Sequence, residues 1–235
     1  MDRNNETTVH HNGALVLMSG GQDSATCLFW ALKQFQTVHA ITFRYGQKHE
    51  IETIAAHKIC DIAGVQLKEV DISFIKDIVV SNLFQGEGAV DVPHSIHCNL
   101  PASYVPYRNL LFLTVAAGWA STLDVHNIVT GVCEADYSGY PDCRDVFIRS
   151  AETTLNLAGG TDYVRLHTPL MTLTKADEFA LAEELGCLDT IITQTLTCYN
   201  AVETMHAYGK GCGECPSCRL RKKGYEDYIQ RKGGR

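Results

Sequence analysis

A short apolar run that ends in a serine and two glycines constrains this chain more than any other feature. Residues 14–18 read Ala-Leu-Val-Leu-Met, and they are followed by Ser19-Gly20-Gly21-Gln22-Asp23-Ser24. Consecutive apolar residues bounded by glycine are typical of a strand buried on both faces, and such strands belong to parallel sheets. Apolar residues at helical spacing follow from Cys27 to Leu32. The chain therefore opens with a predicted strand, loop and helix.

Predicted strands and helices continue to alternate beyond this opening. We expect further strands at 38–43, 67–70, 127–131 and 163–167, and helices at 50–63, 72–80, 109–123, 144–157 and 175–185. Thr174 stands where a helix N-cap is favoured. The segment 81–107 holds several glycines and prolines without periodicity, which is typical of a functional loop or lid. The alternation predicts an α/β fold with a doubly wound, mainly parallel sheet.

Composition and charge exclude several classes of protein. The chain has 235 residues, 45% of them hydrophobic, which is enough for a real core. No apolar run approaches the ~20 residues that span a bilayer, and the polar N-terminus is unlike a signal peptide, so we expect a cytoplasmic protein without a membrane partner. The net charge of −7 argues against binding nucleic acid, and the basic residues near the C-terminus are read as a solvated helix and tail.

The segment from Ser19 to Ser24 has the composition of an anion-binding loop. Two glycines let a ligand approach the main chain, and successive N–H groups at a helix start attract phosphate. The loop lacks the glycine and lysine pattern of a Walker A motif, and the alternative is a plain turn. It resembles the S-G-G-x-D-S signature of the PP-loop ATP pyrophosphatases, which implies ATP binding by Met18, Ser19, Gly20, Gly21, Gln22, Asp23, Ser24, Ala25, Thr26, Cys27 and Leu28.

A cluster of cysteines lies near the C-terminus. The chain has 10 cysteines, and most are scattered singly, whereas Cys212, Cys215 and Cys218 are closely spaced and Cys198 lies upstream. Four thiolates complete a tetrahedral zinc site and leave no position open for catalysis, so we predict one structural Zn²⁺ per chain. An iron–sulfur cluster is the alternative, although the cysteine and proline that close the bacterial cluster motif are absent.

Taken together, the loop and the cysteine pattern resemble the 7-cyano-7-deazaguanine synthase (QueC) family of queuosine biosynthesis. Five further stretches agree with that family, namely 43–49, 105–109, 131–144, 168–171 and 196–199. The resemblance covers residues 14 to about 225. Tyr107 departs from the pattern, because the family usually has a small residue there, and this puts the local loop packing in doubt.

The resemblance implies an ATP-dependent carbon–nitrogen ligase with an adenine nucleotide alpha hydrolase-like (HUP) domain. ATP with Mg²⁺ would adenylate 7-carboxy-7-deazaguanine, ammonia would give the amide, and a second adenylation would give the nitrile. We expect a disordered tail over residues 1–12, an ATP-binding domain over 13–187 and a zinc-binding subdomain over 188–235. The partners would be these small molecules, and the oligomeric state is left open, with a homodimer as one candidate.

The same resemblance directs attention to side chains that would bind substrate. A deazaguanine face offers N–H donors, and the loop after the strand at 127–131 supplies carboxylates and tyrosines at the edge where α/β sheets bind ligands. Each candidate also has a plainer interpretation: a polar surface loop, a helix-start arginine facing solvent, or a solvated surface lysine. The candidate substrate and catalytic residues are Arg108, Glu134, Asp136, Tyr140, Asp142 and Lys175.

Three alternative functions stay open at this point. Another PP-loop adenylating ligase, such as a tRNA-modifying enzyme, would need a basic surface or an added RNA-binding domain. A glutamine-dependent amidotransferase subunit would take its ammonia from a partner. A zinc-ribbon binding module with a degenerate nucleotide loop would need no intact phosphate loop, and nucleotide binding would separate it from the enzymes.

Overall fold

A computed structural model of the protein describes residues 12–46, 51–84, 89, 92–134, 139–160 and 163–234. A five-stranded sheet forms its centre, with the strand order β3-β2-β1-β4-β5 and every neighbouring pair parallel. From β1 the chain first adds β2 and β3 on one side and later adds β4 and β5 on the other side. The sheet is therefore doubly wound, and the order in which strands are added reverses between β1 and β4. This confirms the predicted fold class. The strands are β1 (Gly13–Leu17), β2 (Thr37–Arg44), β3 (Gln66–Asp71), β4 (Asn127–Val129) and β5 (Arg165–His167).

The helices are α1 (Gln22–Gln34), α2 (Ile51–Ala63), α3 (Arg108–Thr122), α4 (Asp145–Gly159), α5 (Lys175–Glu184), α6 (Leu188–Gln194) and α7 (Pro216–Gly233). Helices α1 to α5 and the C-terminal helix α7 fall close to their predicted places, whereas α6 was not predicted. Two 3₁₀ helices, η1 (Ser73–Asp77) and η2 (Pro141–Cys143), complete the set among the described residues. The helix predicted at 72–80 is shorter than expected, because Ile75 is buried whereas Ile78 is 72% exposed and gains nothing from continuing the helix.

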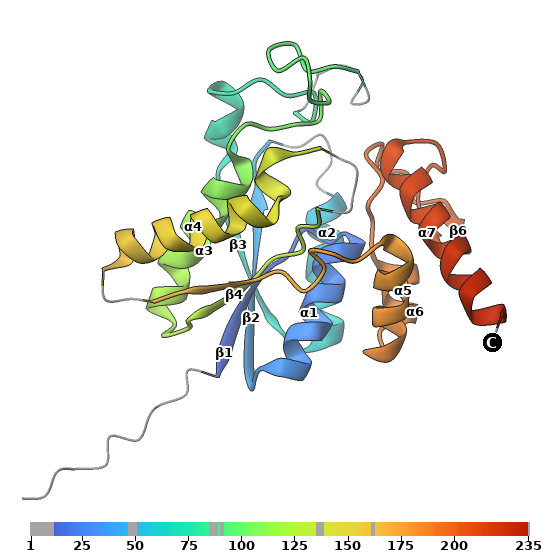
Figure 1. Cartoon of the computed structure of the whole chain (residues 1–235), viewed down its shortest axis with the longest axis horizontal. Coiled ribbons are helices and arrows are strands. Elements are labelled where there is room, and N and C mark those ends of the chain that lie inside the picture. The colour runs from blue at the N-terminus through green and yellow to red at the C-terminus, as the bar shows by residue number, and fades with distance from the viewer. Residues whose placement is uncertain are drawn as a thin grey trace, which may run out of the picture.

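The two faces of the sheet bury separate sets of side chains, as the alternation along β1 shows. Ala14 and Val16 pack into the core formed with α1, α2 and α5, whereas Leu15 lies in the core formed with α3 and α4. Side chains of a strand alternate between its faces, so an all-apolar strand must be covered on both sides. Figure 1 shows α3 and α4 on one side of the molecule and α5, α6 and α7 on the other.

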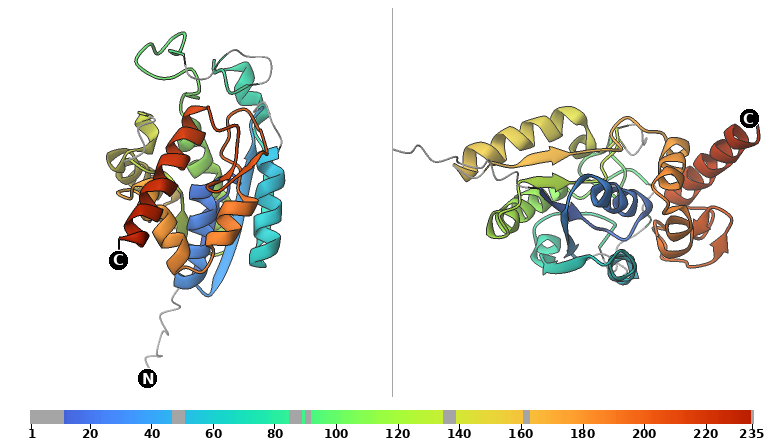
Figure 2. Two further views of the ribbon diagram at one scale, coloured as in Figure 1. Left: turned by 90° about the vertical axis from the view of Figure 1, so that its right-hand side faces the viewer. Right: turned by 90° about the horizontal axis from the view of Figure 1, so that it is seen from below.

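Helix α5 begins with the predicted cap. The Thr174 hydroxyl accepts from the Asp177 N–H, and the Asp177 carboxylate in turn accepts from the Thr174 N–H, which makes a reciprocal capping box. Helix α7 then crosses α5 at very short range, because a Cβ added to Gly224 would lie 2.3 Å from Cβ of Lys175. The two helices lie next to each other in Figure 2, so the C-terminal helix holds the start of α5 in place.

The long irregular segment before α3 is anchored by a buried histidine. His94 is 2% exposed, and its Nε2 donates to the carbonyl of Val80 at 2.8 Å. Its Nδ1 accepts from the N–H groups of Ile96 and His97, each at 3.1 Å. Both ring nitrogens are thereby satisfied, so this histidine is structural, and the interpretation of the segment as a lid stays a prediction.

The chain ends in elements that the sequence pattern did not reveal. Strands β6 (Met205–His206) and β7 (Gly209–Lys210) form a small antiparallel pair beside the cysteine cluster. They are too short to show an alternation of apolar residues.

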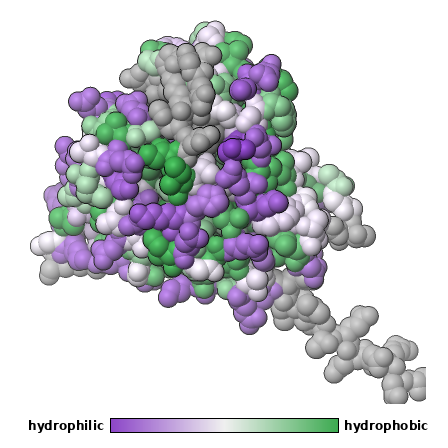
Figure 3. Space-filling view, turned by 180° about the vertical axis from the view of Figure 1, so that it is seen from behind, coloured by the Kyte–Doolittle hydropathy of each residue, from purple (hydrophilic) through white to green (hydrophobic). Residues whose placement is uncertain are grey.

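None of the described helices combines the length and apolar character that crossing a bilayer requires. On the face seen from behind in Figure 3, the described residues mix hydrophilic and hydrophobic side chains.

Candidate active site and metal centre

The loop between β1 and α1 closes on its own hydroxyl groups. The Ser19 N–H donates to Ser24 Oγ at 3.1 Å, and the two serine hydroxyls lie 3.0 Å apart. Ser24 Oγ also donates to the carbonyl of Gly21, while the Gly21 N–H donates to Ser19 Oγ at 3.3 Å. No side chain caps α1 at Gly21, so the first N–H groups of the helix stay available to an anion.

Two neighbouring segments press against this loop, backbone against backbone. Gly20 has φ +85°, and a Cβ there would lie 2.2 Å from the carbonyl oxygen of Glu52 at the start of α2. From the other side, a Cβ on Gly131 would lie 2.9 Å from the carbonyl carbon of Asp23. Gly131 follows β4, so the loops after β1 and β4 meet where the sheet reverses direction. Ligands of doubly wound sheets bind at this crevice.

The lysine at the start of α5 belongs to this loop. Lys175 is 8% exposed, and its Nζ donates to Asp23 Oδ1 at 2.7 Å and to the two oxygens of Glu178 at 3.0 and 3.1 Å. Glu178 is fully buried and also accepts from Nε2 of Gln22 at 3.4 Å. The alternative of a solvated surface lysine is therefore wrong. Helix α7 excludes water here, because Gly224 packs directly on Lys175.

Glu178 is a charged residue near the loop that the sequence reasoning missed. A lysine and a glutamate three positions apart on one helix lie on the same face, so the spacing of Lys175 and Glu178 was the available signal. The spacing alone could not show that this face is buried against α1 and α7.

The remaining loop candidates lie mainly beneath the loop. Met18, Cys27 and Leu28 are buried in the hydrophobic core, at 3%, 0% and 0% exposure. Burial raises the pKa of the Cys27 thiol well above its ordinary value, so it stays neutral. Thr26 bonds back to the carbonyl of Gln22 at 2.9 Å. Together with the buried Ala25, these residues support the loop from below.

A second group of side chains surrounds the start of α3. The Arg108 guanidinium lies 5.5 Å from the centre of the Tyr45 ring and 5.7 Å from that of Phe112, and it donates to the Tyr45 hydroxyl at 3.4 Å. Its Nε is buried and has no hydrogen-bond partner among the described residues. Asp142 is 7% exposed and accepts from the Asn109 N–H at 3.2 Å, so it caps the helix. Burial raises the pKa of Asp142, although Arg108 opposes the shift.

The other candidates after β4 lie in different surroundings. The Tyr140 hydroxyl is 2.6 Å from Ser103 Oγ, and its ring packs 5.8 Å from that of Tyr104. Glu134 is exposed and accepts from the Asp145 N–H at 3.4 Å, near the start of α4. Asp136 lies outside the described residues. Of the carboxylates predicted in this loop, only Asp142 is shown beside Arg108.

A partly buried acid that sequence reasoning overlooked lies between these two groups. Glu52 is in the first turn of α2, its backbone touches Gly20, and its carboxyl interacts with Arg108. Burial raises the pKa of Glu52 to about 7, against the opposing effect of Arg108. An acid with a pKa near neutrality beside an anion-binding loop is suited to proton transfer. A single glutamate in an amphipathic helix gave no sign of this in the sequence.

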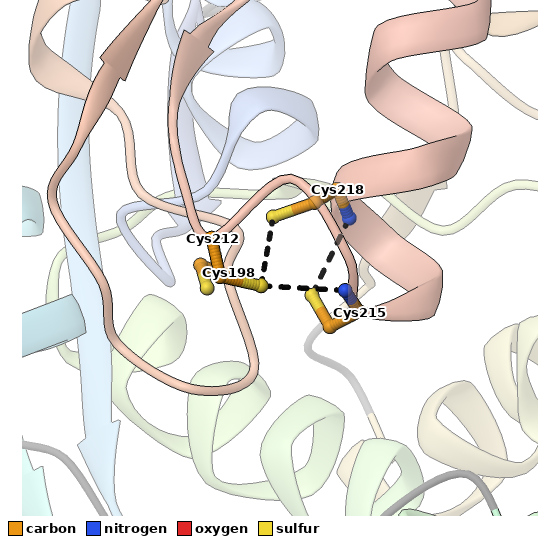
Figure 4. Close-up of side chains that lie close together, drawn as sticks. All are labelled: Cys198, Cys212, Cys215 and Cys218. Atoms are coloured by element: carbon orange, nitrogen blue, oxygen red, sulfur yellow. Dashed lines mark hydrogen bonds between the residues drawn. The ribbon is translucent and has the colours of Figure 1, made fainter.

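The four predicted cysteines come together. The sulfur atoms of Cys198, Cys212, Cys215 and Cys218 all lie within 4.8 Å of one another, and Figure 4 shows them turned toward a common centre. Tetrahedral zinc with bonds of about 2.3 Å holds sulfur atoms about 3.8 Å apart, so the arrangement fits one metal ion. The four-cysteine cluster therefore has the chemistry and the geometry to hold one metal ion.

Backbone N–H groups turn toward these sulfur atoms. The N–H groups of Glu214 and Cys215 donate to Cys212 Sγ at 3.4 and 3.3 Å, and that of Cys218 donates to Cys215 Sγ at 3.5 Å. Hydrogen bonds from the Cys218 side chain and backbone lower the pKa of the Cys215 thiol to about 5. Such donors favour the thiolate form, which is the form that binds a metal.

The segment before Cys198 also contacts the loop of residues 19–24, called the phosphate loop below. The Leu196 N–H donates to the carbonyl of Gly20 at 3.0 Å, two residues before Cys198. Arg221 of α7 is 2% exposed and donates to the carbonyl of Ile191 at 2.8 Å, which ties α7 to α6. The cysteine cluster and the loop after β1 are thus parts of one packed structure.

Comparisons with known proteins match nearly the whole chain. The family described as queuosine biosynthesis protein QueC matches residues 13–229. A relative from Phocaeicola vulgatus, named 7-cyano-7-deazaguanine synthase, is 49% identical over 227 residues, which is 97% of this chain and 99% of that one. One of the same name from Bacillus subtilis is 46% identical over 222 residues, covering 94% and 97% of the two chains.

Solved structures resemble the chain more distantly. A predicted subunit of a tRNA methyltransferase from Methanocaldococcus jannaschii superposes with a TM-score of 0.49 at 22% sequence identity. The superposition covers 73% of this chain and 74% of that one.

Proposed function

The chain belongs to the QueC family of queuosine biosynthesis proteins, and we propose that it makes 7-cyano-7-deazaguanine from 7-carboxy-7-deazaguanine and ammonia with ATP. The observation that carries the proposal is the loop from Ser19 to Ser24, an uncapped helix start at the point where the sheet reverses direction. The family match over nearly the whole chain argues against the amidotransferase and tRNA-modifying alternatives. The five-stranded domain argues against a zinc-ribbon module.

In this proposal the loop binds the phosphates of ATP together with Mg²⁺. A carboxylate oxygen of the substrate attacks the α-phosphorus and pyrophosphate leaves, which gives an acyl adenylate. The uncapped N–H groups of α1 and the two serine hydroxyls would stabilise the charge that develops on the departing pyrophosphate. Lys175, held by Asp23 and Glu178, would add a fixed positive charge. We propose Met18 through Leu28 as the nucleotide-binding segment, with its buried members as support.

The later steps of the proposed reaction convert the acyl adenylate to the amide and then to the nitrile. Ammonia attacks the acyl carbon, AMP leaves with the electron pair of the broken C–O bond, and a proton is lost to give the amide. A second ATP then adenylates the amide oxygen, and loss of AMP with the remaining nitrogen protons gives the nitrile. Glu52 is proposed as the general base that takes such protons, because its carboxyl group has a pKa of about 7 and is partly ionised near neutral pH.

We assign the acceptor to the region around Arg108. Its guanidinium has an unpartnered Nε and lies against two aromatic rings, so it is suited to hold a carboxylate or phosphate beside a flat heterocycle. Asp142 and Tyr140 are proposed to contact the deazaguanine, and Glu134 and Asp136 to line the same loop. Ring contacts between Tyr104 and Tyr140 support an aromatic surface there.

The metal is proposed to be a single structural zinc ion. It would be held by Cys198, Cys212, Cys215 and Cys218 and would supply cross-linking of the C-terminal segment, with no open position for catalysis. The division into an ATP-binding domain, 13–187, and a zinc-binding subdomain, 188–235, belongs to the same proposal. A cytoplasmic location and a homodimer also belong to this proposal. Size-exclusion chromatography with light scattering tests the homodimer.

The function is tested by product analysis. Protein is incubated with ATP, Mg²⁺, ammonium and 7-carboxy-7-deazaguanine, and the nitrile is sought by mass while the nucleotides are separated by chromatography. We expect AMP and pyrophosphate, with half the ATP consumed per nitrile when the amide is supplied instead of the acid. ADP as the main nucleotide product would contradict the assignment of the loop. Ser19→Ala should slow both half-reactions, because one nucleotide site serves both.

A further inference from the structure

Thr197 carries a hydroxyl group that the protein itself leaves unused. Its Oγ1 is buried and has no hydrogen-bond partner among the described residues. Burying a hydroxyl without a hydrogen-bond partner is unfavourable for folding, so native proteins rarely keep one without a reason. Valine has nearly the same shape and would avoid this cost.

This threonine lies beside the phosphate loop. Its methyl carbon Cγ2 would be 3.2 Å from a Cβ added to Gly21, the residue that precedes α1. The side chain therefore stands over the loop backbone, at the uncapped start of the helix. Gln22 in the same loop has a second unpartnered atom, its buried Oε1.

The segment that holds Thr197 is fixed at both ends. On one side the Leu196 N–H donates to the carbonyl of Gly20 at 3.0 Å. On the other side Cys198 is 2% exposed and belongs to the metal centre. A side chain on such a segment has a fixed distance to the loop, which is what a binding residue requires.

A rotation about one bond brings the hydroxyl to the loop. Threonine carries Oγ1, Cγ2 and a hydrogen on Cβ, and its staggered rotamers differ by rotations of about 120° that move each group into the place of the next. One rotamer change thus puts Oγ1 where Cγ2 now lies, beside Gly21. A bound phosphate would supply the hydrogen-bond acceptor that this position lacks.

We propose that Thr197 is a nucleotide-binding residue, whose hydroxyl donates a hydrogen bond to a phosphate oxygen of the ATP held by the phosphate loop. The inference rests on the proposed binding of ATP to residues 19–24. It extends the nucleotide site to the cysteine segment, so that the segment closed by the metal centre completes the site.

Two substitutions separate the hydroxyl from the rest of the side chain. Thr197→Val removes the hydroxyl and keeps the shape, whereas Thr197→Ser keeps the hydroxyl and removes the methyl group. Binding of the non-cleavable analogue α,β-methylene-ATP with Mg²⁺ is measured by calorimetry, and stability by thermal unfolding without nucleotide. We expect Thr197→Val to bind the analogue roughly 10- to 100-fold more weakly, and Thr197→Ser to bind within about threefold of the parent.

Thermal unfolding gives an independent readout. Removing an unpartnered buried hydroxyl should raise the melting temperature of Thr197→Val by about 2–4 °C, while its affinity falls. Unchanged affinity in Thr197→Val, with the parent protein binding normally, would overturn the role of Thr197 and leave the proposed function standing. Failure of the parent protein to bind the analogue would instead overturn the proposed function, and this inference with it.

Discussion

The two sides of the proposed active site are built in different ways. On the nucleotide side, backbone packs on backbone: Gly20 touches the carbonyl of Glu52, and Leu196 donates to the carbonyl of Gly20. On the acceptor side, side chains carry features that are unfavourable for folding. Arg108 has a buried Nε without a hydrogen-bond partner. Tyr107 has a left-handed backbone with φ 60°, and its side chain is 74% exposed, so little packing offsets this strain.

This difference teaches where stability and function coincide. The backbone packing of the nucleotide side is formed before any ligand arrives, so a change to that packing should cost both folding and ATP binding. The acceptor side holds strain and buried charge that a ligand would relieve, which is common at functional sites. Some changes there should make the protein more stable. The four predictions that follow test this contrast, from the largest expected effect to the smallest.

Loss of one metal ligand should have the largest effect. Cys215→Ser is expected to lower the free energy of unfolding by at least about 4 kcal/mol, because zinc binding contributes about 10–16 kcal/mol to folding in structural sites. ATP binding should fall with it, since the cysteine segment contacts Gly20. Elemental analysis should show about one zinc per chain in the parent protein and less in the variant. Cys98→Ser is the control, because Cys98 is exposed and outside the cluster. Iron with sulfide in place of zinc would contradict the metal assignment.

A methyl group on Gly20 tests the backbone packing of the nucleotide side. Gly20→Ala should destabilise the fold by about 3 kcal/mol or more, because its Cβ would lie 2.2 Å from a backbone oxygen at a φ of +85°. Gly64→Ala is the matched control, with φ +68° and no atom within 4 Å of the new carbon, and should cost about 1 kcal/mol. Chemical denaturation measures both. Equal losses in the two variants would show that the contact with Glu52 has no part in the effect.

Removing the charge of Glu52 should stabilise the protein at alkaline pH. The pKa is raised from 4.5 to about 7, so the folded state holds a proton between these values that the unfolded state has lost, and stability falls as pH rises through this window. Glu52→Gln lacks this pH dependence. Its free energy of unfolding should exceed that of the parent by as much as about 3 kcal/mol at pH 8 and differ little from it at pH 4. Denaturant titrations at both pH values measure it, with Glu226→Gln at an exposed position as control. A gap that stays constant with pH would show that the Glu52 carboxyl does not titrate as expected.

The smallest effect concerns Tyr107. Tyr107→Gly should raise the free energy of unfolding by about 0.5–1 kcal/mol, because glycine adopts the left-handed region without strain and the exposed ring contributes little packing. Tyr107→Ala keeps a Cβ in the same conformation and should stay closer to the parent. Thermal melts compare the three proteins. A loss of stability in Tyr107→Gly would mean that the ring supports the fold after all.

Much of the fold was predictable because its elements have local causes. The all-apolar run at β1 requires cover on both faces, and this requirement by itself indicates the α/β class and the parallel sheet. The phosphate loop and the four cysteines were found because each uses neighbouring residues at a fixed spacing. Short elements escaped prediction: β6 and β7 have too few residues for a period to show.

The sequence by itself determined the doubly wound class, the loop at 19–24, the four-cysteine cluster and the family, because each depends on residue types at short, regular spacing. Only the tertiary structure decided the states of single side chains. It buried Lys175 under Gly224, placed Asp142 as a cap on α3, and set Glu52 against Gly20. It also put Thr197 beside Gly21, far away in the chain. Burial and charge depend on which segments meet in space, and segments distant in sequence leave no local pattern that announces their contact.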